Sequence, residues 1–320
     1  MNVHDAGDEA RGPLPRTPAV LRGLPHAGGG VESGISVPQL ARLVDHRLHV
    51  ESLDPDSLAR SVRLAVEYGV GAVTCRPGDV ATVATLVREH ATDVGLRWRR
   101  PGSPGQSAPA GTAGAAPPWR SPLVGVATAL EFERRATSVE ALLEETRDLT
   151  LSGASELALL VDEQRLPVPP ARDRVLAAAP APTPDRGARR DWREAVAALV
   201  EAQPRYRFRL RVHLDTSEMT DDVVRRACES LRAAGVWMVQ AGTWRGPRTS
   251  FSQIRVMREA LGGATRLKWT SPVSSLHGLL LAVAEGVDRC NAEDTFVLLG
   301  AAEQHARVGP IRVPRPGLVG

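Results

Sequence analysis

Lysine is nearly absent from this chain. Lys268 is the single lysine among the 40 basic residues of the 320-residue sequence, and all the others are arginine. Arginine and lysine serve equally well on most protein surfaces, so a lysine that persists against such a preference indicates a role specific to a primary amine. Lys268 is therefore the first candidate for a functional side chain.

Aromatic residues and cysteines are also scarce. Aromatics make up 4% of the chain, so we expect a core built from Leu, Val and Ala. The three cysteines, Cys75, Cys228 and Cys290, are odd in number and show no CxxC spacing, which argues against a disulfide framework. We expect three small core residues in a reduced, cytoplasmic protein, with no metal site and no cofactor.

Long apolar runs are missing as well. No stretch reaches the roughly 18 apolar residues that a membrane-spanning helix needs. The first residues combine acids and prolines, unlike the basic flank and apolar segment of a secretory signal. The net charge of +3 is small and the basic residues are dispersed, so neither a membrane nor a nucleic acid is an expected partner.

Three segments have the composition of low-complexity sequence. Residues 1–35 are rich in Gly, Pro and Arg without periodicity and are predicted to form a disordered arm. Residues 99–120 and 167–190 have the same character and are interpreted as surface insertions. The remaining sequence, residues 36–308, reads as one domain followed by a tail over 309–320.

Within that domain, short β-like runs alternate with amphipathic helices. The runs cover residues 43–48, 72–76, 123–130, 156–162, 208–215, 236–241, 266–269 and 287–291. The helical patterns cover residues 55–68, 79–90, 138–152, 191–202, 220–234, 250–261, 275–285 and 293–307. Eight such β/α units predict an α/β protein with a single closed (β/α)8 TIM barrel. The alternative, an open doubly wound sheet, lacks a GxGxxG motif after the first strand.

Several motifs resemble, in order, those of deoxyribose-phosphate aldolases. Residues 44–48 (VDHRL) are similar to the family's I-D-H-T-L, and 153–157 (GASEL) to its G-A-D-E-I. The likeness continues through residues 72–77, 212–216, 220–222, 227–229, 253–258 and 267–268. The resemblance spans roughly residues 43 to 294, and it implies a class I aldolase barrel.

The catalytic positions of that family are altered here. The resemblance places Gln240 where the family's sixth strand carries its Schiff-base lysine, and Ala158 where the fourth strand carries the relay Asp. An amide has no nucleophilic lone pair with which to attack a carbonyl. Arg211 stands for the fifth-strand lysine, and Lys268 matches the seventh-strand lysine that lowers the pKa of the reactive amine.

The implied phosphate site is changed too. After Lys268 the family has S-G-G, whereas this chain has Thr270, Ser271 and Pro272, and proline has no N–H to offer a phosphate. Thr243, Thr270 and Ser271 remain as candidate ligand-binding residues. The last strand's G-T-S-S is replaced by residues 291–294 (NAED), whose acids would repel a dianion. Trp237, Trp244 and Trp269 are expected at strand ends, where they would narrow or plug the pocket.

Two interpretations of Lys268 stay open. It is either a Schiff-base amine, served by Asp45, Asp162 or Asp215 as acid/base groups, or a structural amine paired with an acid such as Asp45 or Asp215. His46 is expected to be a core or loop histidine rather than a metal ligand, because its neighbour His49 points to another face.

The sequence therefore favours an aldolase-like protein that has lost aldolase chemistry and acts as a binding or regulatory pseudoenzyme. The alternative is an active, divergent carbon–carbon lyase that uses Lys268 on a sugar phosphate or aldehyde. A third possibility is a scaffold protein whose Arg/Pro-rich arms bind a partner. A homodimer, or a pairing with an active relative, is the assembly that the resemblance implies.

Overall fold

The computed structural model describes residues 34–48, 54–98, 124–130, 138–161, 192–216, 219–242 and 249–317. Residues 1–33 of the predicted arm, both predicted insertions, His49, Asp162, Thr243 and Trp244 lie outside these residues. Within them no helix is long and apolar enough to cross a membrane.

Eight parallel strands close into one barrel in sequence order. The strands are β1 (Val44–Arg47), β2 (Ala72–Thr74), β3 (Gly125–Leu130), β4 (Glu156–Val161), β5 (Arg209–Asp215), β6 (Met238–Gly242), β7 (Arg266–Val273) and β8 (Arg289–Ala292). The pairing of β1 with β8, through Val44 with Cys290 and Asp45 with Asn291, closes the ring. This arrangement confirms the predicted (β/α)8 TIM barrel.

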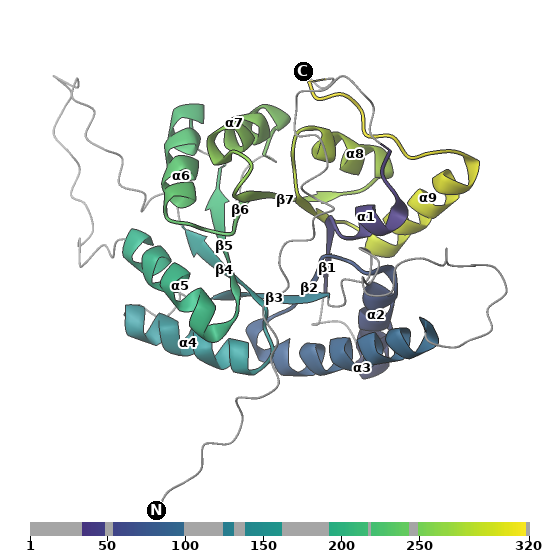
Figure 1. The fold of residues 1–320 in the computed structure, drawn as a ribbon, viewed down its shortest axis with the longest axis horizontal. Helices are drawn as coiled ribbons and strands as arrows, with labels where there is room; N and C mark the ends of the chain where they lie inside the picture. Colours follow the sequence, from purple (N-terminus) through teal and green to yellow (C-terminus); the bar gives the residue numbers. More distant parts are fainter. Residues whose placement is uncertain are drawn as a thin grey trace, which may run out of the picture.

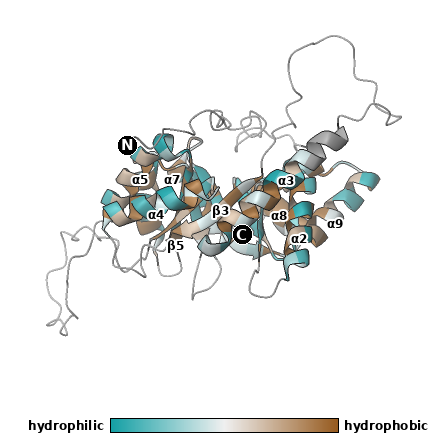
Figure 2. Cartoon of the chain, turned by 90° about the horizontal axis from the view of Figure 1, so that it is seen from below, coloured by the Kyte–Doolittle hydropathy of each residue, from teal (hydrophilic) through white to brown (hydrophobic). Residues whose placement is uncertain are grey.

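Helices surround the strands, as Figure 1 shows. They are α1 (Val37–Ala41), α2 (Pro55–Tyr68), α3 (Val80–Trp98), α4 (Val139–Leu151), α5 (Trp192–Tyr206), α6 (Asp221–Ala233), α7 (Phe251–Leu261), α8 (Leu276–Ala284) and α9 (Thr295–Val308), with a 3-10 turn η3 (Pro77–Asp79). Their hydrophobic and hydrophilic residues occupy different faces (Figure 2), as expected for helices packed on a sheet.

Helix boundaries follow local capping chemistry. The side chain of Asp54 accepts a hydrogen bond from Ser57 N at the start of α2, and Gly69 ends that helix in the left-handed conformation at φ 70°. Ser138 and Ser250 cap α4 and α7 in the same way. These signals are local in sequence, so most predicted helices lie within a few residues of the observed ones.

Three predicted boundaries are wrong, and one helix was missed. The helix predicted over 79–90 continues to Trp98, the helix predicted to end at 202 continues to Tyr206, and the seventh strand continues past residue 269 to Val273. The short helix α1 was not predicted, because five residues are too few to show a period.

The C-terminal segment is also more ordered than a tail. Ile311 is buried, and its carbonyl oxygen accepts a hydrogen bond from Ile35 N at 2.9 Å. An isolated antiparallel bridge joins Gly34 to Arg312. The two ends of the described domain are therefore paired with each other.

All three cysteines are buried and free. Burial raises the pKa of each thiol to about 12, with the charge of Asp79 adding to the effect at Cys75. These thiols therefore stay protonated and pack as small core residues, as the sequence predicted.

Candidate functional site

Long polar side chains fill the interior of the barrel. In β5, Leu210, Val212 and Leu214 are fully buried and alternate with Arg211 and His213. Successive side chains of a strand point to opposite faces, so one of these two sets faces the helices and the other faces the barrel axis. Since the apolar set joins the core cluster with the helices, the polar set points inward.

The strand register shows which residues of the neighbouring strands also face the interior. His213 pairs with Gln240, Gln240 with Lys268, and Lys268 with Arg289. Residues paired across parallel strands point to the same side, so these side chains share the interior. Gln240 thus faces inward, at the position the resemblance assigns to the family's reactive lysine, and is 5% exposed.

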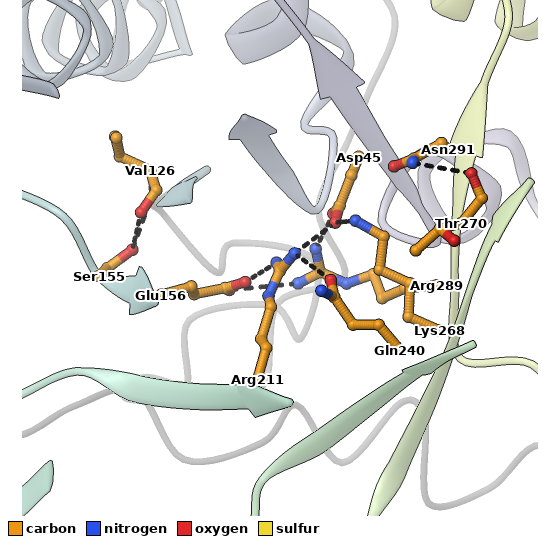
Figure 3. A network of polar contacts seen from close by, with 10 residues as sticks. All are labelled: Asp45, Val126, Ser155, Glu156, Arg211, Gln240, Lys268, Thr270, Arg289 and Asn291. Carbon is orange, nitrogen blue, oxygen red and sulfur yellow. Dashed lines mark hydrogen bonds and ion pairs between the residues drawn. The ribbon is translucent and has the colours of Figure 1, made fainter. Parts of the chain in front are cut away.

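Asp45 on β1 lies at the centre of the interior network. Lys268 Nζ donates to its Oδ2 atom at 2.5 Å, and Arg211 Nη1 donates to the same oxygen at 2.8 Å. Arg289 binds the other oxygen, Oδ1. Figure 3 shows the three cationic groups converging on this carboxylate, which is 0% exposed. Lys268 is thus paired with Asp45, one of the two acids that the sequence offered.

A second carboxylate, Glu156 on β4, supports the network. Its Oε2 pairs with Arg211, and its Oε1 lies 3.5 Å from Arg289 Nη2. Each of the two arginines therefore spans both acids, which fixes the planes of their guanidinium groups. Sequence reasoning did not assign a role to Glu156 or Arg289.

The other predicted site residues lie around this network. Arg211 Nη1 donates to Gln240 Oε1 at 3.5 Å. Ala158 pairs with Arg211 in the register, so its methyl group also faces the interior. Asp215 pairs with Gly242 at the carboxyl end of β5, nearer the mouth of the barrel. No described ion pair joins Asp215 to Lys268.

The charges of this cluster shift several pKa values. Burial opposes ionisation of Asp45, but the charges of Arg211, Lys268 and Arg289 outweigh it and hold the pKa of that carboxyl well below its usual range. Burial lowers the pKa of Lys268 to about 8, although the charge of Asp45 acts in the opposite direction. Lys268 is therefore an ion-paired amine that loses its proton more easily than an ordinary lysine.

His213 is a further interior residue that the sequence did not single out. Burial, aided by the charge of Lys268, lowers the pKa of its imidazole to about 4. It lies beside Gly242, where an added Cβ would come within 3.2 Å of His213 Cε1 and would overlap Thr270 Oγ1. His213 is therefore neutral near pH 7. A usable sequence signal was the alternation of polar and apolar residues along β5 (RLRVHLD).

The predicted phosphate-binding hydroxyls are engaged or buried. Thr270 Oγ1 donates to Ala241 O at 2.7 Å, and Asn291 Nδ2 donates to Thr270 O at 3.1 Å. Ser271 is buried on the extended part of β7. Asp294, expected to repel a phosphate, caps α9 by accepting from the N–H groups of Phe296 and Val297.

Neither described candidate tryptophan plugs the interior. Trp269 lies one residue from the inward Lys268 and packs outward, with its ring 5.1 Å from that of Phe251 on α7. Trp237 precedes β6 and lies at the end where the strands begin. Trp269 therefore does not narrow the pocket, and Trp237 lies at the end of the barrel opposite to the mouth, where its ring packs against arginines.

His46 is a packing residue. Its ring nitrogens lie 3.0 Å from Thr295 Oγ1 and 2.8 Å from Ser61 Oγ, which joins β1 to α9 and α2. Among the described residues, no group of three or more His, Cys, Asp and Glu side chains could hold a metal ion.

A closed parallel barrel with helices around it and a lysine inside it defines a protein of the TIM-barrel class. Comparison with curated proteins finds deoxyribose-phosphate aldolases. That of Clostridium perfringens strain 13 is 22% identical over 265 residues, which cover 81% of this chain and 94% of the relative. Deoxyribose-phosphate aldolase 1 of Bacillus licheniformis is 24% identical over 259 residues, 79% of this chain and 92% of that protein. No family model matches the chain.

Solved structures agree on the fold. A putative deoxyribose-phosphate aldolase from Coccidioides immitis superposes with a TM-score of 0.60 at 19% identity, covering 85% of this chain and 88% of that chain. The tetrameric deoxyribose phosphate aldolase from Aeropyrum pernix gives 0.60 at 16% identity, covering 84% and 93%. The chain has a deoxyribose-phosphate aldolase-like TIM-barrel fold.

Proposed function

We propose that this protein is a divergent relative of deoxyribose-phosphate aldolase that has lost aldolase chemistry and acts as a binding or regulatory protein. The observation that carries the proposal is the inward-facing amide of Gln240. A class I aldolase needs a primary amine there, because its chemistry proceeds through nucleophilic attack on the substrate carbonyl. The lone pair of an amide nitrogen is delocalised and does not make that attack.

The surroundings of Gln240 support the same conclusion. Ala158 has no proton to relay, and the interior acid Asp45 is held ionised by three cations. An acid that stays ionised cannot act as a proton donor near neutral pH. A sugar phosphate or an aldehyde remains the ligand class that the family resemblance suggests.

Borohydride trapping tests this proposal. The protein is incubated with deoxyribose 5-phosphate or acetaldehyde, reduced with borohydride, and its intact mass is measured. We expect no mass increase for the wild-type chain. Gln240→Lys is the matched control, because it returns an amine to the same interior position beside Arg211. An adduct on wild-type Lys268 would overturn the proposal, whereas ligand binding by calorimetry without an adduct would support it.

The second candidate function is an active lyase that uses Lys268. The observation that favours it is the pKa of about 8, which leaves about a tenth of the amine neutral at pH 7. Against it, Lys268 Nζ is held 2.5 Å from Asp45 and is 3% exposed. Lys268→Met separates the two functions, because it would abolish an adduct formed by the second and leave ligand binding under the first.

Self-association belongs to the same proposal. The Aeropyrum pernix structure is described as a tetramer, and we propose that this chain also pairs with itself or with an active relative. Light scattering of the purified full chain tests this, and a monomer at all concentrations would exclude the self-pairing.

A further inference from the structure

Arginines are concentrated where the strands begin. β5, β7 and β8 start at Arg209, Arg266 and Arg289, and Trp237 directly precedes β6. Because all eight strands are parallel, these residues meet at one end of the barrel, which we call the amino-terminal end. It is opposite to the carboxyl-terminal end, where TIM-barrel active sites lie.

Three guanidinium groups pack against the ring of Trp237. The Cζ atoms of Arg209, Arg266 and Arg211 lie 4.9, 5.4 and 5.9 Å from the centroid of its ring. The charge of Arg289 acts on both Arg209 and Arg266, which places a fourth guanidinium group in the same cluster. Three guanidinium groups are therefore held around one aromatic ring, and a fourth lies close enough to act on two of them.

The carboxylates next to Arg211, Arg266 and Arg289 are already bound by other cations or shared between them. Arg211 and Arg289 share Asp45 and Glu156 with Lys268. Asp288, the other acid that acts on Arg266, is bound by Arg258 at 3.0 Å. No carboxylate in the described part of the chain forms an ion pair with Arg266, which is only 9% exposed.

Two buried donors of the cluster also lack an acceptor. Arg211 Nε and Arg289 Nε are buried and have no hydrogen-bond partner among the described residues, and the two side chains are 1% and 5% exposed. A buried, unsatisfied charged donor costs several kcal/mol unless a ligand or water accepts its hydrogen.

We propose that the amino-terminal end of the barrel binds a small phosphate-bearing anion through Arg209, Arg266 and the adjacent Arg289. A phosphate supplies two negative charges and several acceptor oxygens, which match clustered guanidinium donors. Arg209 and Trp237 are partly exposed, so the cluster is open to solvent on their side. Burial and the charge of Arg289 lower the pKa of Arg266 to about 10, which is the effect that a bound anion would relieve.

The experiment compares anions at equal ionic strength. The melting temperature of the full chain is measured in inorganic phosphate and in chloride, and phosphate affinity is measured by calorimetry. We expect a concentration-dependent stabilisation by phosphate that chloride does not give. Glycerol 3-phosphate, run beside glycerol, then distinguishes a phosphate ester from free phosphate as the preferred form.

Substitutions of individual arginines test which residues bind the phosphate. Arg266→Gln and Arg209→Gln are each expected to weaken phosphate binding by about ten-fold or more, since each removes a charged hydrogen-bond donor. Arg266→Lys, which keeps the charge but not the planar fork, should weaken it less. Arg225→Gln, on an exposed arginine paired with Glu259, is the matched control and should bind as wild type.

Two results would overturn the proposal. One is equal stabilisation by phosphate and chloride, which would mean that Trp237, Glu156 and backbone carbonyls satisfy the cluster without a ligand. The other is unchanged phosphate affinity in Arg209→Gln, a half-exposed position whose replacement does not depend on rebuilding the interior. The wild-type comparison decides the first result even if Arg266→Gln fails to fold.

Discussion

The two sides of the barrel wall fill its interior in opposite ways. The inward positions of β2 and β3 hold only small residues, namely Ala72, Thr74, Gly125, Ala127 and Ala129. The inward positions of β5, β7 and β8 include Arg211, Lys268 and Arg289. Figure 3 shows the long side chains extending to Asp45 and Glu156 on other strands.

Small residues on one side make room for large charged ones on the other. A Cβ on Gly125 would lie 2.9 Å from Glu156 Oε1, and a Cβ on Gly71 would overlap the guanidinium of Arg289. TIM-barrel interiors usually hold layers of branched aliphatic side chains. Here arginine stems provide that volume, and the fold consequently depends on a few acids to keep the charged groups in place.

The largest effect is expected at Asp45. Asp45→Ala removes the carboxylate partner of Lys268 and leaves Arg211 and Arg289 with Glu156 alone, so the free energy of unfolding should fall by about 3–5 kcal/mol. Urea unfolding followed by circular dichroism measures the change. Glu259→Ala, at an exposed pair with Arg225, is the control and should cost less than about 1 kcal/mol. Equal free energies of unfolding for the two variants would show that the interior arginines and Lys268 do not need Asp45 for stability.

Lowering the pH should reduce the free energy of unfolding because His213 must take up a proton. Its pKa is about 4 in the folded chain against 6.5 for an ordinary histidine. Between these two pH values the histidine is protonated in the unfolded chain but not in the folded chain. The free energy of unfolding therefore decreases as the pH is lowered from 6.5 to 4, by up to about 3 kcal/mol. Unfolding of wild type and His213→Gln across this range isolates the effect. Parallel pH profiles would contradict it.

Enlarging a small inward-facing residue next to the arginines should also be costly. Ala158→Leu adds volume directly beside Arg211 and should lower the free energy of unfolding by about 1–3 kcal/mol through overpacking. Ala301→Leu, on the exposed face of α9, is the matched control and should stay within about 0.5 kcal/mol. A fully tolerated Ala158→Leu would mean that the interior has unused space.

The smallest effect at pH 7 is expected at Lys268. Lys268→Met removes a buried charge while Asp45 keeps both arginines, so stability should change by less than about 1 kcal/mol. The wild-type chain, whose Lys268 pKa is about 8 rather than 10.5, binds fewer protons when folded than when unfolded between these values. Its stability should therefore rise with pH there, by about 1 kcal/mol per unit, and Lys268→Met should lack this rise. A rise that persists in the variant would assign it to another group.

The sequence predicted the barrel because its signals are local. Strand runs, caps such as Asp54, and glycines such as Gly69 act within a few residues, and the order of motifs fixed the family likeness. The candidate site was predicted only in part. Lys268, Arg211 and Asp45 do meet. Glu156 and Arg289 were missed, since nothing in the sequence indicated that β4 and β8 contribute to the same interior layer, and His213 was missed although β5 alternates polar and apolar residues.

The sequence by itself determined which residues alternate along each strand. It therefore also determined that one face of β5 and one face of β7 carry charged side chains. Only the closed tertiary structure decided that this face points inward and that Asp45, rather than Asp215, pairs with Lys268. The physical reason is that closure brings β1 beside β8 and across from β5. Side chains more than 160 positions apart in the chain then share one carboxylate.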